Sequence, residues 1–156
     1  MSLTAIQLDR AIGAIVASAA GDALGSQYEF GPSLSDETRV AFGVGTFGHG
    51  VGEWTDDTSM AMPILEALAR GDSLTDAETL GPIVARWLEW SRTAKDVGAQ
   101  TSHVLHALHG QTTEALARSA AQAVHEASGR SGGNGSLMRT GPLAVLGHEV
   151  GDGVLM

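Results

Sequence analysis

Four side chains with oxygen atoms stand in a row at Thr55, Asp56, Asp57 and Thr58, directly before an apolar stretch that begins at Met60. Mg²⁺ and Ca²⁺ prefer carboxylate and hydroxyl oxygens, and neighbouring carboxylates repel each other unless a cation lies between them. The pattern therefore indicates a site for a hard metal ion. A simpler interpretation stays open, in which Thr55 is the N-cap of a helix and the two acids complement the helix dipole.

Two further carboxylates precede this cluster. Glu29 lies between Tyr28 and Phe30, and apolar surroundings raise the pKa of a carboxyl group, as general acid or base catalysis requires. A glutamate that is simply exposed beside two aromatic residues is the alternative. Asp22, which lies in the segment 21–25 with a glycine at each end, is either an ordinary cap or loop acid or a part of the same site.

A glycine-rich segment, Ser128 to Arg139, joins two regions with helical patterns. Its bare backbone amides lie close to an apolar run that begins at Leu137, and such amides bind phosphate or pyrophosphate without a lysine. Arg130 and Arg139 would supplement them. No lysine follows the last glycine and no nucleophile elbow is present, so the segment is not a Walker A loop and Ser136 is a poor nucleophile candidate. A flexible linker is the alternative interpretation.

The elements that must position these residues have helical patterns, and no persuasive strand is found, so the sequence predicts an all-α fold. The first helix should be buried on most sides, the second should be kinked or shifted by Pro63, and the third should open on a capping box. The expected helices are Thr4–Leu24, Thr55–Arg70, Thr75–Arg92, Val97–His109 and Thr113–Ala127. The glycine-rich loop 31–52 should fold beside Thr55. Its GVGTFG stretch lacks the βαβ context of a dinucleotide fingerprint.

Composition limits the possible functions. The 156 residues are 43% hydrophobic, which fits one globular domain spanning residues 1–156, and the net charge of −9 argues against nonspecific nucleic-acid binding. The absence of cysteine excludes thiolate metal sites and cysteine nucleophiles. His103, His106 and His109 do not have the i, i+4 spacing of a zinc pair.

No segment is long enough to cross a membrane, and the apolar run 11–20 follows a poor signal-peptide n-region, so we expect a cytoplasmic protein.

Together, three ordered motifs resemble the ADP-ribosylglycohydrolases, which include the dinitrogenase-reductase-activating glycohydrolases. The motifs are GDALGSQYEF at 21–30, GEWTDDTSMA at 52–61 and GGNGSLMRTGPLA at 132–144. The resemblance spans nearly the whole chain. It implies an all-α multi-helix bundle with two Mg²⁺ or Mn²⁺ ions in a central cleft.

The resemblance also implies roles for individual residues. Thr55, Asp56 and Asp57 match metal ligands, and Glu29 matches the glutamate that positions or activates water. The loop from Gly132 through Gly133, Asn134 and Gly135 to Ser136 matches the part that holds the pyrophosphate and adjoining ribose of ADP-ribose, with Arg139 beside it. The implied reaction is hydrolysis of the glycosidic bond between ADP-ribose and an acceptor, with the metal ions binding the ribose hydroxyls and orienting water.

One feature of the family has no counterpart here. Family members are about twice as long and carry a second acidic motif of the type Gly-Asp-Thr-Asp-Thr near the C-terminus, and Asp152 alone does not replace it. The chain therefore looks like the N-terminal half of the fold. One hypothesis is a hydrolase whose remaining ligands come from a second chain, a further segment or a homo-oligomer. The other is a non-catalytic fragment that binds ADP-ribose-like ligands or a partner protein.

Overall fold

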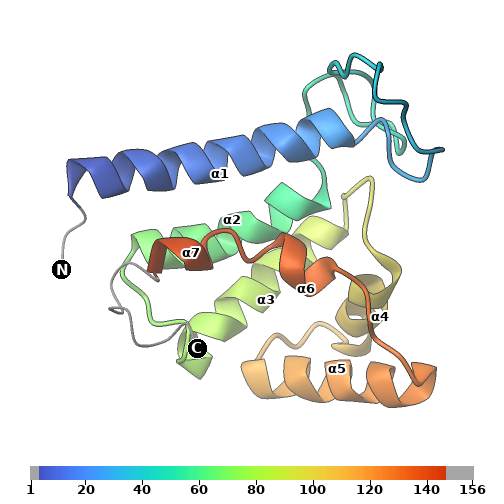
Figure 1. The fold of residues 1–156 in the computed structure, drawn as a ribbon. Helices are drawn as coiled ribbons and strands as arrows, with labels where there is room; N and C mark the ends of the chain where they lie inside the picture. The colour runs from blue at the N-terminus through green and yellow to red at the C-terminus, as the bar shows by residue number, and fades with distance from the viewer. Residues whose placement is uncertain (1–3, 147–156) are drawn as a thin grey trace.

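The computed structural model describes the backbone of residues 4–146 and the side chains of residues 4–144. The described chain is helical throughout, with loops and turns between the helices and no strand, which confirms the all-α prediction. The long helices are α1 (Ala5–Gly25), α2 (Asp56–Ala69), α3 (Ala77–Ser91), α4 (Ala99–Ala107) and α5 (Glu114–Ser128), and the short ones are α6 (Gly135–Met138) and α7 (Leu143–Leu146). Figure 1 shows α1 as an outer layer on one side, α2 and α3 in the middle, and α4 and α5 on the opposite side.

Helices α2 and α3 hold the molecule together, because α2 packs on α1, α3 and α6, and α3 also packs on α4 and α5. Two clusters of buried side chains fill these contacts: Ile64, Ala67 and Ile83 between α2 and α3, and Val84, Leu105, Leu108 and Ala120 between α3, α4 and α5. Trp87 packs against both clusters, and its indole Nε1 donates a hydrogen bond to the carbonyl oxygen of Met60 at 2.8 Å. Burial of each large aliphatic side chain contributes about 1.5–3 kcal/mol.

The predicted first helix exists, but the prediction that it is buried on most sides was wrong. A capping box formed by Thr4 and Gln7 fixes its start. Ala23 is buried, whereas the apolar residues of the first turns remain 50–66% exposed at Ile6, Leu8, Ile12 and Val16. The reason is that, among the described elements, α1 packs mainly on α2, so one of its faces is covered. None of the described helices is long and apolar enough to cross a membrane.

One of the two outcomes expected for α2, and the capping box expected for α3, need correction. The start of α2 is not shifted by the buried Pro63, and a kink at this residue stays a prediction. The predicted capping box at the start of α3 is absent, because Asp76 is the N-cap and makes no side-chain cap hydrogen bond. Gly81 in α3 has a packing role: a Cβ there would lie 3.1 Å from the carbonyl oxygen of Thr112, so the missing side chain lets this segment approach.

The loop 26–55 folds back on the end of α1. The Gly45 amide donates to the carbonyl oxygen of His49 at 2.9 Å, and the Thr46 amide donates to that of Ser26 at 3.0 Å. A Cβ at Gly45 would lie 2.9 Å from the Cβ of His49 and 3.0 Å from the Ser26 Oγ, so glycine is required there. This packing brings the end of the loop to the start of α2, as the sequence predicts.

Candidate active site

The start of α2 is capped by a carboxylate from another helix. Asp22 lies in the last turns of α1, and its carboxylate accepts from the Thr55 amide at 3.1 Å and from the Thr58 amide at 3.0 Å. The hydroxyls of Thr55 and Thr58 also donate to Asp22, each at 2.5 Å. The expected cap by the Thr55 side chain was therefore wrong, because Thr55 is the N-cap by position but makes no side-chain cap bond. Asp22 satisfies the free amides of the first turn instead.

Asp56 and Asp57 follow directly, and their carboxylates are crowded. Asp56 is 9% exposed, and Asp57 is half-buried. Burial, together with the charges of the nearby carboxylates of Asp22 and Asp56, raises the pKa of Asp57 to about 6. Negative charge at this point of the structure is therefore unfavourable without a cation.

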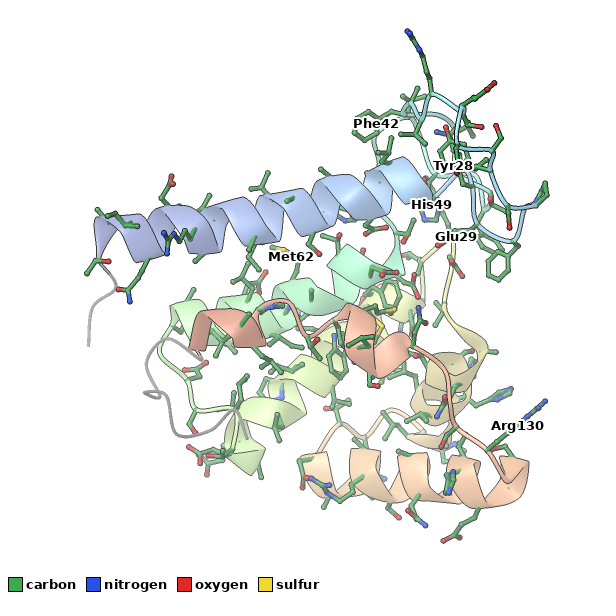
Figure 2. All side chains as sticks on the ribbon, viewed as in Figure 1. Tyr28, Glu29, Phe42, His49, Met62 and Arg130 are labelled. Carbon is green, nitrogen blue, oxygen red and sulfur yellow. The ribbon has the colours of Figure 1, made fainter. Side chains whose placement is uncertain are left out.

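Glu29 and Asp96 belong to the same group of acids. Burial raises the pKa of Glu29, and so do the charges of Asp96 and Asp56. Asp96 comes from the segment between α3 and α4, and its pKa is raised by burial and by the charge of Asp56. The aromatic neighbours of Glu29 are not the enclosing groups that the sequence suggested, since Phe30 is 87% exposed. Figure 2 shows Glu29 and His49 near the C-terminal end of α1.

Asp96 was missed by reasoning from the sequence. It stands alone in a short connection, with no second acid or hydroxyl beside it. The one feature of the sequence that could have pointed to Asp96 is its position two residues before Gly98, the N-cap of α4. Only the packing of α4 against α3 brings it to Asp56.

A cleft of about 520 Å³ opens between Asp56, the first turn of α4 and the glycine-rich segment. The segment contributes the wall residues Ser131, Gly133, Asn134, Gly135, Ser136 and Arg139. Gly132 is not among the residues that line the cleft, and Glu29, Thr55 and Asp57 lie outside its lining as well. Apolar side chains of α3, α4 and α5, including Val84, Trp87 and Leu105, form the remaining wall.

The first turn of α4 also lines this cleft, besides the glycine-rich segment. Helix α4 begins at Ala99 with Gly98 as N-cap, and no side chain caps its first turn. Ala99, Gln100 and Thr101 from this turn line the cleft opposite the glycine-rich segment. Backbone N–H groups at a helix start favour anions. The sequence indicated the glycine-rich segment, and it did not indicate α4.

The two arginines of the glycine-rich segment differ in their surroundings. The Arg139 guanidinium lies 4.7 Å from the centre of the Trp87 ring, and burial lowers its pKa while the charge of Asp56 acts in the opposite direction. This cation–π contact fixes Arg139 on the wall of the cleft. Arg130 is exposed, and Figure 2 shows it pointing outward, away from Glu29 and His49.

The oxygen atoms at the start of α2 are of the type that binds a hard divalent ion, because such an ion prefers carboxylate and hydroxyl oxygens as ligands. Burial and repulsion by Asp22 and Asp56 raise the pKa of Asp57, and such an ion would offset both effects. Within the described part of the chain, however, no three His, Asp or Glu side chains converge closely enough to hold a metal ion.

The sequence profile of the ADP-ribosylglycohydrolases matches residues 3–153. The chain belongs to the ADP-ribosylglycohydrolase family. Two curated relatives are similar in sequence to 89% of this chain. They are the ADP-ribosylarginine hydrolase Tri1 of Pseudomonas putida (strain GB-1), 33% identical, and the protein of the same name of Serratia proteamaculans (strain 568), 29% identical.

The chain spans 36% and 37% of the lengths of these two relatives. The resemblance inferred from the three motifs and the all-α fold are thereby confirmed. Residues 151–156, including Asp152, lie outside the described residues. Every residue discussed above as part of the site lies within the matched range.

Proposed function

We propose that this chain provides the metal-binding and ADP-ribose-binding part of a hydrolase that cleaves the bond between ADP-ribose and an arginine side chain. The observation that carries the proposal is the position of Asp56. It belongs to the acidic cluster at the start of α2 and also lines the 520 Å³ cleft whose opposite wall is the glycine-rich segment. The name of the two relatives supports arginine as the acceptor.

Thr55, Asp56 and Asp57 would hold Mg²⁺ or Mn²⁺, completed by ligands outside the described residues or from a second chain. The bound metal ions supply a positive charge that binds the ribose hydroxyls and orients water. Asp22 positions one of these ligands, because the Thr55 hydroxyl donates its proton to Asp22 and so keeps its lone pairs available.

The remaining residues bind substrate and move a proton. Amides of the glycine-rich segment and of the first turn of α4 donate hydrogen bonds to the pyrophosphate oxygens, and Arg139 adds a fixed positive charge. Glu29 accepts a proton from water, and its raised pKa makes it a stronger base than an ordinary carboxylate. The water oxygen bonds to the anomeric carbon as the carbon–nitrogen bond breaks, and the proton that Glu29 took from the water passes to the leaving guanidine.

A release assay tests this function. Purified chain is incubated with an ADP-ribosylarginine peptide, with and without Mg²⁺ or Mn²⁺, and free ADP-ribose is quantified. We expect metal-dependent release that is lost in Asp56→Ala, while Asp76→Ala, at an exposed N-cap without a side-chain bond, retains it. Intact mass and circular dichroism of each preparation confirm that the chain is whole and folded.

A second candidate function is binding without hydrolysis. It is favoured by one observation, the absence of a three-residue metal cluster among the described side chains. A folded chain that binds ADP-ribose but releases none from the peptide would support this alternative. Release restored by adding the remaining part of the family fold as a second polypeptide would instead assign the missing ligands to that part.

A further inference from the structure

A second cavity, of about 170 Å³, shares Asp56 with the large cleft. It lies between the loop 49–55, the start of α2 and the connection from α3 to α4. Its lining includes the side chains of His49, Trp54, Trp90 and Asp96. We propose that this cavity is the subsite for a guanidinium group, the acceptor end of the substrate. The proposal rests on the proposed function and adds to it the residues that recognise the acceptor.

The size of the cavity suits a small group. One water molecule takes about 30 Å³ of liquid volume, so the cavity has room for several waters or for a guanidinium with its adjacent methylene. Because Asp56 borders both spaces, a ligand whose ribose lies in the large cleft can extend past Asp56 into the small cavity.

The charge of the lining favours a cation. Lys95 is the one Lys or Arg that lines the cavity among the described residues, and its Nζ lies 2.6 and 2.8 Å from the two carboxylate oxygens of Glu53. That pair is neutral overall. The carboxylates of Asp56 and Asp96 remain, and each is partly or largely buried. An organic cation would compensate the charge of Asp96 in particular, while Asp56 faces the metal side.

A buried group without a partner points to the same ligand. His49 is 5% exposed, and its Nδ1 is buried without a hydrogen-bond partner. An unsatisfied buried nitrogen is costly. A guanidinium N–H is a suitable donor to an imidazole nitrogen, and a small movement of the His49 ring would open Nδ1 to a ligand in the cavity.

The two tryptophans select guanidinium over ammonium. Trp54 and Trp90 both line the cavity, and Trp54 is 48% exposed at its rim. A guanidinium is planar and weakly hydrated, and it stacks on aromatic faces while its N–H groups reach carboxylates in the same plane. An ammonium is compact and strongly hydrated, and it makes no such stack. The lining therefore matches arginine better than lysine as the acceptor.

The test is a titration of the chain with methylguanidinium chloride, followed by the indole N–H signals of its three tryptophans in ¹H–¹⁵N spectra. Trp87 lies on the wall of the large cleft and serves as the internal reference. Single Trp→Phe variants assign the signals. We expect saturable shifts at Trp54 and Trp90 and little change at Trp87, with at least fivefold weaker binding of methylammonium at the same ionic strength.

Variants locate the effect. Asp96→Asn should weaken methylguanidinium binding at least fivefold, whereas Asp72→Asn, at a partly buried acid just after α2 that pairs with Arg70 and does not line the cavity, should leave it unchanged. Trp90→Leu is a second test, because it removes a ring and keeps the carboxylates. Non-saturable shifts, equal binding of methylammonium, or unchanged binding in both folded variants would each overturn the proposal.

The peptide release assay separates this proposal from the proposed function. Saturable methylguanidinium binding at Trp54 and Trp90 without any release would support the subsite and contradict hydrolysis by the chain alone. Metal-dependent release with no shift at these two tryptophans would support hydrolysis and overturn the subsite.

Discussion

The Asp22 carboxylate lies 2.5 Å from the Thr55 hydroxyl, so a side chain of α1 positions the first oxygen donor of α2. The same carboxylate accepts hydrogen bonds from the amides of Thr55 and Thr58, which have no partner within the first turn of α2. Helix α1 is therefore tied to the candidate metal site by a polar contact, although most of its apolar side chains remain exposed. The contact makes stability and site geometry depend on one residue.

Replacing Asp22 should destabilise the protein strongly. Asp22→Ala removes an acceptor for four donors in a partly buried place, and we expect a loss of about 3 kcal/mol in the free energy of unfolding. Urea denaturation followed by circular dichroism measures it. Asp76→Ala is the matched control, since Asp76 is also an N-cap aspartate but makes no side-chain cap bond, and its effect should stay below about 0.5 kcal/mol. Equal losses in both variants would contradict the assigned role of Asp22.

The free energy of unfolding should fall as pH rises from about 4 to about 7 because of Asp57. The pKa of Asp57 rises from its ordinary 3.8 to about 6 in the folded chain, so the native state binds more protons than the unfolded state in this interval. Stability is then fully present below the unfolded pKa and is lost as pH passes through the folded pKa. Because Asp57 is only half-buried, solvent screening reduces the effect to about 1 kcal/mol.

Asp57→Asn tests this pH dependence. In urea denaturation without added metal, the free energy of unfolding of this variant should fall by about 1 kcal/mol less between pH 4 and pH 7 than that of the unmodified chain. Asp9→Asn, at an exposed position of α1, is the control and should leave the profile unchanged. Adding Mg²⁺ at pH 7 should stabilise the unmodified chain more than the Asp57→Asn variant. The same pH slope in the variant and the unmodified chain would refute the assignment.

Much of the fold follows from the sequence, because helix start signals and apolar periodicity are local. Helix α5 begins where Thr113 indicates, and the Thr113 hydroxyl accepts the Leu116 amide at 3.4 Å. What covers a helix is not a local property. The apolar residues of α1 gave no indication that one face would stay exposed, and an aspartate between two glycines gave no indication that it caps another helix.

The site was predictable where its residues are neighbours in the sequence and was missed where they meet through tertiary packing. Asp56 and the glycine-rich segment were both indicated, and the cleft contains both. Asp96 and the first turn of α4 were not indicated, since each lacks a local signature. The sequence also gave Gly132 and Gly133 the same expected role, whereas only Gly133 lines the cleft.

That difference predicts unequal effects on ligand binding. Gly133→Val places a branched side chain on the cleft wall, where a Cβ would lie 3.2 Å from the flexible end of Gln100. A Cβ at Gly132 would meet nothing within 4 Å. We expect about tenfold weaker ADP-ribose binding for Gly133→Val, or about 1.4 kcal/mol, and less than about twofold for Gly132→Val. Isothermal titration calorimetry measures both, and similar losses in the two variants would contradict this placement of the ligand.

The two arginines of the glycine-rich segment allow a similar comparison based on charge. Arg139 is held 4.7 Å from the centre of the Trp87 ring on the cleft wall, while Arg130 is exposed and points outward. A guanidinium ordered before binding loses little entropy when it contacts a phosphate, and lysine cannot reproduce the stack or the paired donors. Arg139→Lys should therefore weaken ADP-ribose binding about five- to tenfold, which corresponds to about 1–1.4 kcal/mol, and Arg130→Lys should change it less than about twofold.

Calorimetry at two salt concentrations separates a specific contact of Arg139 from general electrostatic attraction, because screening weakens the general attraction at high salt. If Arg130→Lys and Arg139→Lys reduced affinity equally, the segment would bind the anion through diffuse charge, and the fixed position of Arg139 on Trp87 would have no role in recognition.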